Sequence, residues 1–220
     1  MNTDFWLERW ARNEIGFHQR RFNEYLVEYW PTLGIDPRAT AFVPLCGKAL
    51  DLRWLRQHEG HPVLGVEIAR NACVEFFAEW GIEPKIESRA PFESFAGQGV
   101  KILCGDFFAL QPADLTNVGG VFDRAALIAL PADMRAAYAR KLRELLEPKT
   151  RVLLVAPDYA QHEMKGPPFA VGESEIHSLF AGCTIDRLAE VDITDAPENA
   201  RFRQRGVTRL IERAFRIVIV

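Results

Sequence analysis

Glu67 is the residue whose type and position indicate binding chemistry most directly. It is the last residue of the apolar run PVLGVE (62–67) and lies about twenty residues after Gly47. At that spacing, an acidic residue at the end of a strand accepts hydrogen bonds from the two hydroxyls of a ribose. An ionised acceptor makes stronger hydrogen bonds than a neutral one, so it would hold the sugar in one position. The structural alternative is a helix cap or a surface carboxylate.

The turn PLCGK (44–48) limits what this ligand can be. Gly47 is its one glycine, whereas a dinucleotide site has G-x-G-x-x-G and a P-loop has G-x-x-x-x-G-K-[ST]. One glycine allows one close approach of ligand to backbone, which suits a ribose or a carboxylate without a phosphate. S-adenosyl-L-methionine is a nucleoside ligand of this kind. The alternative is an ordinary turn between a strand and a helix.

Two further apolar runs also end on residues that can bind a ligand. Asp106 ends the run VKILCGD and Phe107 follows it. The carboxylate can accept from an adenine amino group, and the ring can pack on the base. Their alternative roles are a helix cap and a core residue. Arg124 follows the next run, and a buried arginine needs an anionic partner. That partner is either the neighbouring Asp123 or the carboxylate of a cofactor or substrate.

An alternation of strand-like and helix-like segments positions these residues. Seven strands are predicted, at 40–45, 62–67, 100–106, 118–125, 151–157, 182–190 and 207–219. Helical patterns separate most of them, for example at 131–146 and around 173–180. This alternation favours an α/β fold with a parallel sheet covered by helices on both faces. Such sheets bind ligands beyond the carboxyl ends of their strands. Because no linker interrupts the pattern, we expect one domain over 1–220.

Composition excludes several classes of protein. Hydrophobic residues make up 48% of the 220 residues, which is too many for a disordered chain. The 27 Lys and Arg residues against 30 Asp and Glu residues leave a net charge of -3. A chain without basic excess is not expected to bind nucleic acid.

Cysteine spacing and the N-terminus indicate the compartment. The four cysteines, Cys46, Cys73, Cys104 and Cys183, form no C-x-x-C pair, so we expect free thiols and no metal site. The polar sequence HEGH (58–61) is predicted as a solvated turn. The first residues lack the basic and then apolar order of a signal peptide. No apolar run is long enough to span a bilayer. We therefore expect a cytoplasmic protein without a membrane partner.

Six segments together resemble the thiopurine S-methyltransferase family in its short bacterial form. They are FWLERWARNEIGFHQ, FVPLCGKALDLRWL, VLGVEIARNACVEFF, ILCGDFFAL, FDRAALIALP and MKGPPFAV, in that order along the chain. The resemblance runs from about Phe5 to the C-terminus. It implies a Rossmann-like class I methyltransferase fold: a seven-stranded, mostly parallel sheet that ends in an antiparallel hairpin.

The resemblance also implies a role for individual residues. Those expected to bind S-adenosyl-L-methionine, or its product S-adenosyl-L-homocysteine, are Trp6, Trp10, Leu45, Gly47, Glu67, Asp106, Phe107 and Arg124. Residues expected to hold the substrate are Phe17, His18 and Arg124, with Asp158 a further candidate. Residues 1–30 are expected to form a helical lid whose aromatic rings face the sulfonium.

The implied reaction is transfer of a methyl group to the sulfur of a small aromatic or heterocyclic thiol, such as a thiopurine. An aromatic thiol ionises readily, so no residue is predicted as a catalytic acid or base. Two alternatives remain open: methylation of small anions such as tellurite, selenium species or halide, and a cofactor-binding module without turnover. We expect a monomer whose partner is a small-molecule thiol.

Overall fold

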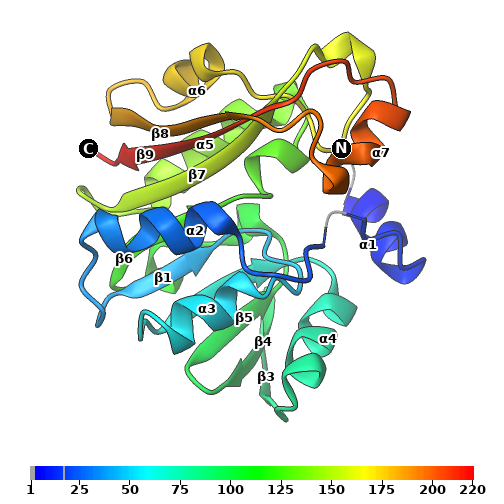
Figure 1. The fold of residues 1–220 in the computed structure, drawn as a ribbon. Helices are drawn as coiled ribbons and strands as arrows, with labels where there is room; N and C mark the ends of the chain where they lie inside the picture. The colour runs from blue at the N-terminus through cyan, green and yellow to red at the C-terminus, as the bar shows by residue number, and fades with distance from the viewer. Residues whose placement is uncertain (1–2, 17) are drawn as a thin grey trace. The chain divides into compact units, whose positions relative to one another are not determined.

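A computed structural model describes residues 3–16 and 18–220, and the chain divides into two compact units. The first unit is Met1–Phe122 and the second is Asp123–Val220. Each unit contains its own helices and strands (Figure 1). The single domain over 1–220 and the lid over 1–30 stay predictions.

A mixed sheet organises the first unit, with strands in the order β3-β4-β5-β2-β1-β6. The strands are β1 (Thr40–Val43), β2 (Val63–Glu67), β3 (Lys85–Arg89), β4 (Phe92–Gly97), β5 (Val100–Cys104) and β6 (Val118–Asp123). β1 pairs in parallel with β2 and β6, and β2 pairs in parallel with β5. Every residue of β2 is buried, as expected for a strand covered on both faces. Parallel pairing brings the carboxyl ends of β1, β2 and β5 to the same edge of the sheet.

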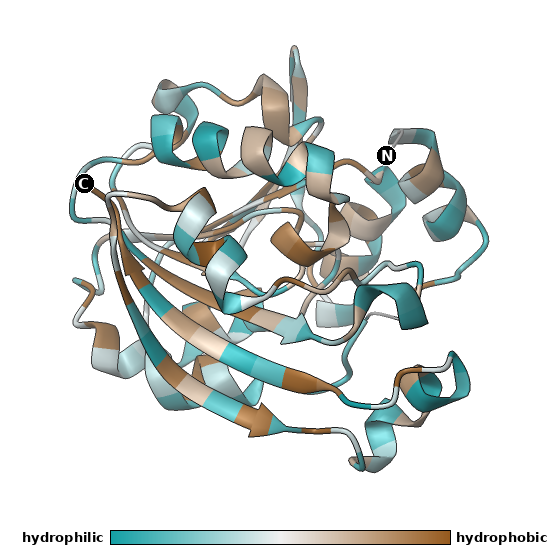
Figure 2. Ribbon diagram, turned by 90° about the horizontal axis from the view of Figure 1, so that it is seen from above, coloured by the Kyte–Doolittle hydropathy of each residue, from teal (hydrophilic) through white to brown (hydrophobic). Residues whose placement is uncertain are grey.

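Helices of the first unit follow the periodicity of their apolar residues. They are α1 (Thr3–Ala11), α2 (Glu24–Tyr29), α3 (Asp51–Gln57) and α4 (Arg70–Trp80), with the short 3-10 helices η1 (Trp30–Leu33), η2 (Phe107–Ala109) and η3 (Pro112–Asp114). α4 buries Ala72, Cys73, Phe76 and Phe77, and it contacts β2, β4 and β5. It ends at Gly81, whose φ of 71° is favourable for glycine. Helix ribbons alternate between hydrophilic and hydrophobic colours in Figure 2, as expected for amphipathic helices.

The second unit contains an antiparallel group of strands in the order β7-β9-β8. Its strands are β7 (Arg151–Asp158), β8 (Thr184–Asp192) and β9 (Ile211–Val218). Its helices are α5 (Ala132–Leu145), α6 (Glu173–Leu179) and α7 (Ala200–Gln204), with the 3-10 helices η4 (Leu127–Ala129), η5 (Gln161–Glu163) and η6 (Pro197–Asn199). The antiparallel pairing of β8 with β9 confirms the predicted C-terminal hairpin.

The predicted count of seven strands is wrong, because the described residues contain nine. The two additional strands, β3 and β4, form a hairpin that joins β5 in an antiparallel direction. All five residues of β3 are exposed, so this edge strand lacks the apolar alternation on which a prediction from sequence depends. Its charged residues are typical of a protected sheet edge.

Two kinds of feature are absent from the described residues. No helix there combines the length and the apolar character that crossing a membrane requires. Those residues also contain no group of three or more His, Cys, Asp or Glu side chains arranged to hold a metal ion.

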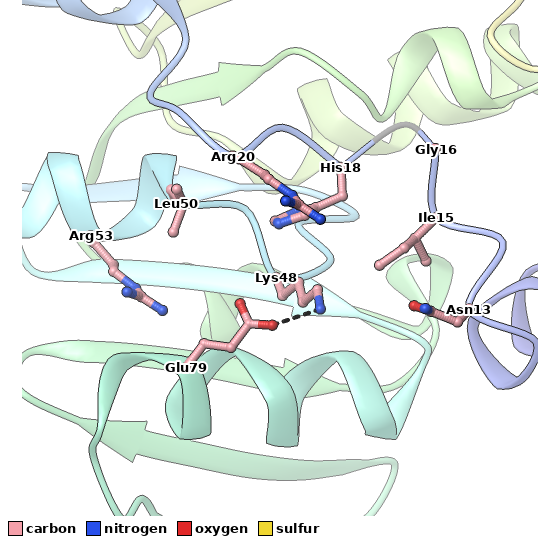
Figure 3. Close-up of a pocket in the computed structure, with 9 residues that line it drawn as sticks. All are labelled: Asn13, Ile15, Gly16, His18, Arg20, Lys48, Leu50, Arg53 and Glu79. Atoms are coloured by element: carbon pink, nitrogen blue, oxygen red, sulfur yellow. Dashed lines mark hydrogen bonds and ion pairs between the residues drawn. The ribbon is translucent and has the colours of Figure 1, made fainter.

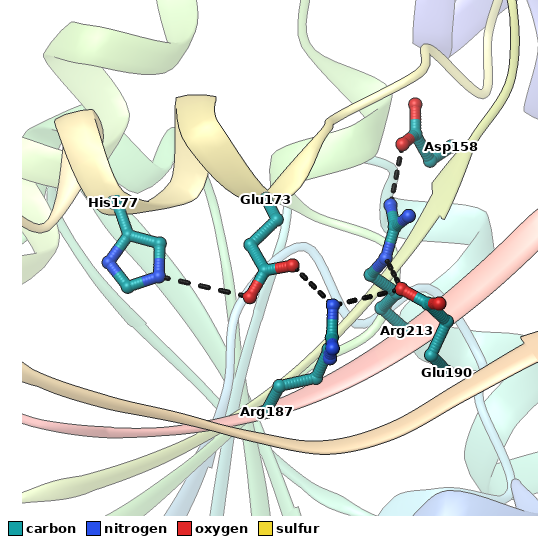
Figure 4. Close-up of polar contacts among 6 residues, drawn as sticks. All are labelled: Asp158, Glu173, His177, Arg187, Glu190 and Arg213. Carbon is teal, nitrogen blue, oxygen red and sulfur yellow. Dashed lines mark hydrogen bonds and ion pairs between the residues drawn. The ribbon is translucent and has the colours of Figure 1, made fainter.

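A network of ion pairs connects the strands of the second unit with α6 (Figure 4). Arg213 of β9 binds Asp158 of β7 at 2.5 Å and Glu190 of β8 at 2.6 Å. Arg187 of β8 extends the network, since it binds Glu190 at 2.9 Å and Glu173 of α6 at 2.6 Å. Asp158, the further candidate for substrate contact, is therefore part of a structural network.

Replacing Arg213 by methionine is expected to lower the free energy of unfolding by about 2 kcal/mol. The Arg213 side chain is 15% exposed, and removing one partner of a largely buried ion pair leaves the other charges uncompensated. Urea unfolding measures the change. Arg209→Met is the matched control, because Arg209 is 73% exposed where it binds Asp192, and the control should keep the parental midpoint. Equal midpoints for both variants would contradict this role of Arg213.

Candidate functional site

The turn after β1 contains two residues with positive φ angles and is hydrogen-bonded to β2. Leu45 has a φ of 47° and Gly47 a φ of 52°. A positive φ is uncommon for leucine, and such outliers gather at binding sites. The Cys46 amide donates to the Val66 carbonyl at 2.9 Å. This bond attaches the turn to β2, one residue before Glu67.

Glu67 connects this turn to the start of α4. It is 5% exposed, and its two carboxylate oxygens accept from the amides of Gly47 and Ala69, each at 2.8 Å. Burial raises the pKa of Glu67, and the backbone amides oppose that shift. A carboxylate offers about four lone-pair sites, so two amide bonds leave acceptor capacity for a ligand. The structural alternative, a cap near α4, and the predicted role in binding are therefore compatible.

Trp10 packs against the glycine of the same turn. A Cβ atom placed on Gly47 would lie 3.0 Å from Cζ2 of Trp10, so a larger residue there would have to push the indole back. The Trp10 side chain is buried and forms a cluster with Ala69 and Ala72, against which Ile15 packs. Trp10, Gly47 and Glu67 thus meet in the first unit, although they are far apart in sequence. Trp6 lies one turn earlier in α1, half-buried, with its ring edge-to-face with Phe5.

The end of β5 lies beside Glu67. Cys104, the last residue of β5, is in register with Glu67, and the Gly105 amide donates to the Glu67 carbonyl at 2.9 Å. Asp106 is exposed, and its Oδ1 accepts from the Phe108 amide at 2.9 Å, which caps η2. Phe107 is buried. The capping and core roles are both present, and the binding of adenine by this pair stays a prediction.

A pocket of about 740 Å³ opens on the first unit (Figure 3). The residues that line it are Asn13, Ile15, Gly16, His18, Arg20, Lys48, Leu50, Arg53 and Glu79. It therefore includes His18, one of the predicted substrate residues. Phe17, the other aromatic candidate, lies outside the described residues.

Lys48, which follows Gly47, is directed toward α4. Its Nζ binds Glu75 and Glu79 at 2.7 Å each, and its side chain is 9% exposed. Burial acts to lower the pKa of Lys48, but the two carboxylates outweigh it and the pKa is raised. Because two acidic partners neutralise this lysine, it contributes little net charge to the pocket.

The second unit begins with Asp123, the last residue of β6, and Arg124 follows it. The Asp123 carboxylate is 1% exposed and accepts from the Tyr138 hydroxyl at 2.7 Å and from the amides of Ala126 and Leu127 at 3.2 Å. Burial raises the pKa of Asp123 to about 6. Arg124 is half-buried, and its binding role stays a prediction.

Arg201 is a residue of the second unit that the sequence did not single out. Burial lowers its pKa, and repulsion by Arg124 and Arg205 lowers it further. Arg201 and the two arginines that repel it form a cationic cluster suited to an anion. Only the folded chain identifies it, because α7 belongs to a segment with no predicted helix and several arginines.

The first unit fits a nucleoside ligand without a phosphate. Glu67 supplies buried acceptors, Gly47 leaves room for a close approach, and Trp10 adds an aromatic surface beside both. The Cys46 and Gly47 amides in the turn after β1 already have acceptors, so they are not free to bind a pyrophosphate. S-adenosyl-L-methionine agrees with this set of donors and acceptors.

Replacing Gly47 by alanine is expected to lower the affinity for S-adenosyl-L-homocysteine about tenfold, a change of about 1.4 kcal/mol. The new methyl group would displace Trp10, and the φ of 52° would add backbone strain. Gly34→Ala is the matched control, since Gly34 has a φ of 65° but a Cβ atom placed on it would meet no other atom within 4 Å. Titration calorimetry should find parental affinity in the control. Equal affinities for both variants would remove Gly47 from the site.

The family model and the curated sequences that match this chain carry the same description. The family model described as "Thiopurine S-methyltransferase (TPMT)" matches residues 1–218. A thiopurine S-methyltransferase of Azotobacter vinelandii is 48% identical over 218 residues, which cover 99% of each chain. One of Pseudomonas putida is 45% identical over 217 residues, again 99% of each chain.

Two solved methyltransferase structures have a similar fold. A SAM-dependent methyltransferase from Anabaena variabilis has a TM-score of 0.65 at 14% identity, covering 100% of this chain and 96% of its own. The 1,6-didemethyltoxoflavin-N1-methyltransferase of Burkholderia thailandensis, with bound S-adenosylhomocysteine, has a TM-score of 0.64 at 13% identity, covering 98% of this chain and 86% of its own. These likenesses concern the fold, and they confirm the predicted Rossmann-like α/β class.

Proposed function

Because the chain belongs to the thiopurine S-methyltransferase family, we propose that it methylates the sulfur of a small, anionic aromatic or heterocyclic thiol, with thiopurines among its substrates. The methyl donor of this S-methyltransferase is S-adenosyl-L-methionine. The observation that most supports the proposed site is the meeting of Glu67, Gly47 and Trp10 at the carboxyl ends of β1 and β2.

We assign the nucleoside part of the cofactor to the first unit. Glu67 accepts from the ribose hydroxyls, Leu45 and Gly47 lie along the ligand, and Trp6 and Trp10 cover it. Asp106 and Phe107 would contact the adenine. Arg124 would bind a carboxylate, either that of the cofactor or that of an anionic substrate.

Methyl transfer to a thiolate requires the protein to align the nucleophile with the methyl group, and it requires little proton transfer. When bound, the cofactor supplies a methyl group on a cationic sulfur whose departure as a neutral thioether is favourable. The chain's residues therefore bind the reactants, bring nucleophile and methyl carbon to about 3 Å in line, and exclude water. Buried Trp10 and the half-buried Trp6 provide such an apolar cover.

The cationic cluster of the second unit supports an anionic nucleophile. Arg124 and Arg205 repel Arg201, and an aromatic thiolate bound there would reduce that repulsion by adding a negative charge. A thiolate needs no base to remove its proton. This agrees with the expectation that no dedicated catalytic acid or base is required.

The test is transfer of labelled methyl groups to 6-mercaptopurine and to 2-mercaptobenzoate. We expect the Arg201→Met variant to lose about tenfold in kcat/KM for both thiols, since it removes one charge of the cluster. Arg203→Met is the control, because Arg203 lies on the same helix and donates to the Thr194 carbonyl. Absence of transfer to either thiol by the parent enzyme would contradict the proposed substrate class.

The alternative substrates give a different product. Tellurite, selenium species or halide would be converted into volatile methylated compounds, which headspace chromatography detects. If these formed faster than methylated thiols, the natural substrate would be a small inorganic anion. We also propose a cytoplasmic monomer that does not bind nucleic acid, and sedimentation analysis tests the monomer directly.

A further inference from the structure

Lys48 connects the turn after β1 with helix α4. Its Nζ donates to Oε2 of Glu75 and to Oε1 of Glu79, each at 2.7 Å, and Figure 3 shows the second of these bonds. The two glutamates are four residues apart, so they lie on one face of the helix. The lysine side chain is 9% exposed, whereas those of Glu75 and Glu79 are 40% and 45% exposed. One nearly buried ammonium group thus binds two successive turns of α4.

Backbone hydrogen bonds hold the same turn on the side of β2. The Cys46 amide donates to the Val66 carbonyl at 2.9 Å, and the Gly47 amide donates to a carboxylate oxygen of Glu67 at 2.8 Å. Both bonds attach the turn to the strand. Lys48, the next residue, attaches it to the helix through a side chain instead.

The turn and α4 are therefore joined at two separate places. At the start of the helix, the Glu67 carboxylate accepts from the amides of Gly47 and Ala69, each at 2.8 Å. Glu75 and Glu79 lie about 9 and 15 Å further along the helix than Ala69, at 1.5 Å per residue. A segment can rotate about a single attachment, whereas two separated attachments fix its orientation. The ammonium bonds thus complement those of Glu67 in fixing the orientation of the turn.

We propose that Lys48 is a positioning residue for methyl transfer, whose bonds to α4 hold the Gly47 backbone in the orientation that aligns the cofactor with the nucleophile. The proposal rests on the proposed function, because it takes Gly47 as part of the cofactor site. Glu67 remains available to the ribose when the lysine is removed, so we expect alignment to suffer more than binding. A displacement of about 1 Å caused by a residue away from the reacting atoms can lower a rate about 100-fold.

Lys48→Met tests this role, because methionine keeps an unbranched apolar chain and removes the charge. We expect kcat for 6-mercaptopurine to fall about tenfold, while the Kd for S-adenosyl-L-homocysteine rises at most about threefold. Labelled methyl transfer and titration calorimetry measure the two quantities. A parental kcat in the folded variant would overturn the proposal, and so would a loss confined to the Kd.

The two carboxylates provide an independent test. Either one can bind the ammonium group alone, so Glu75→Ala and Glu79→Ala should each lower kcat less than the double variant, which should lose about as much as Lys48→Met. Combining both changes with Lys48→Met should cost no more than Lys48→Met alone, because all three act through one interaction. Losses that multiply would show that Lys48 acts independently of α4, and they would overturn the proposal.

Arg56→Met is the matched control in the same unit. Arg56 of α3 also bridges separate segments, since its side chain donates to the carbonyls of Gly60 and Gln98 at 3.0 Å each. Those carbonyls precede β2 and β5, so they lie at the opposite edge of the sheet from the proposed cofactor site. The control should keep the parental kcat and Kd.

Urea unfolding separates positioning from stability alone. If Lys48→Met lowered only the unfolding midpoint, with parental kcat and Kd where the variant is folded, the role of Lys48 would be structural and the proposal would be wrong. A parent chain that neither binds S-adenosyl-L-homocysteine nor methylates 6-mercaptopurine would instead refute the proposed function.

Discussion

Replacing Glu67 by glutamine is expected to weaken binding of S-adenosyl-L-homocysteine by about 1.5–3 kcal/mol, the range for hydrogen bonds to a charged group. This corresponds to a roughly 10- to 150-fold higher Kd. Two effects contribute. The ribose hydroxyls lose an ionised acceptor. In the parent chain the backbone amides of Gly47 and Ala69 each donate to one carboxylate oxygen of Glu67. In the glutamine variant the side-chain NH2 group, which is a donor, must face one of these two N–H groups. Titration calorimetry measures the change.

Two controls separate binding from folding in this experiment. Thermal unfolding of the unliganded variant reports how much the two backbone hydrogen bonds contribute to stability. Glu87→Gln changes another carboxylate of the same sheet, which lies on the exposed strand β3 and binds Lys85, and it should keep the parental Kd. A folded Glu67→Gln variant with parental affinity would disprove the ribose assignment.

The free energy of unfolding is expected to depend on pH through the ionisation of Asp123. Its pKa is raised by burial from an ordinary 3.8 to about 6, so the folded chain holds this proton more tightly than the unfolded chain. The free energy of unfolding therefore falls as pH rises from about 4 to about 6 and is level above that range. At about 1.4 kcal/mol for each pKa unit, this group accounts for a loss of about 3 kcal/mol.

Urea unfolding at a series of pH values tests this dependence. Asp123→Asn should remove it, because the asparagine stays neutral, can accept from the amides of Ala126 and Leu127, and can donate to the Tyr138 oxygen. Tyr138→Phe should move the midpoint to higher pH, since the hydroxyl donation at 2.7 Å lowers the pKa of this carboxyl. Parallel curves for the parent and Asp123→Asn would show that Asp123 does not titrate in this range.

Much of the fold could be predicted from local patterns. All seven predicted strands are present, because apolar runs bounded by turn residues are visible in short windows of sequence. The hairpin of β3 and β4 was missed because β3 is exposed throughout. The sequence HEGH was predicted as a solvated turn, and this is wrong for His61. That side chain is 1% exposed, and its Nε2 accepts from the Trp30 indole at 3.1 Å, a contact over 31 residues.

Local sequence patterns were enough to predict which residues stand at the ends of parallel strands, and these residues indicate the class of ligand. One glycine after β1 and an acid after β2 are local features, and parallel pairing necessarily places them at one edge. The hydrogen-bond partner of each group became known only from the folded chain. Glu67 accepts from two amides, Asp123 binds Tyr138 and Trp30 donates to His61. These partners depend on how helices pack against strands, and no periodicity in the chain encodes which side chains that packing brings together.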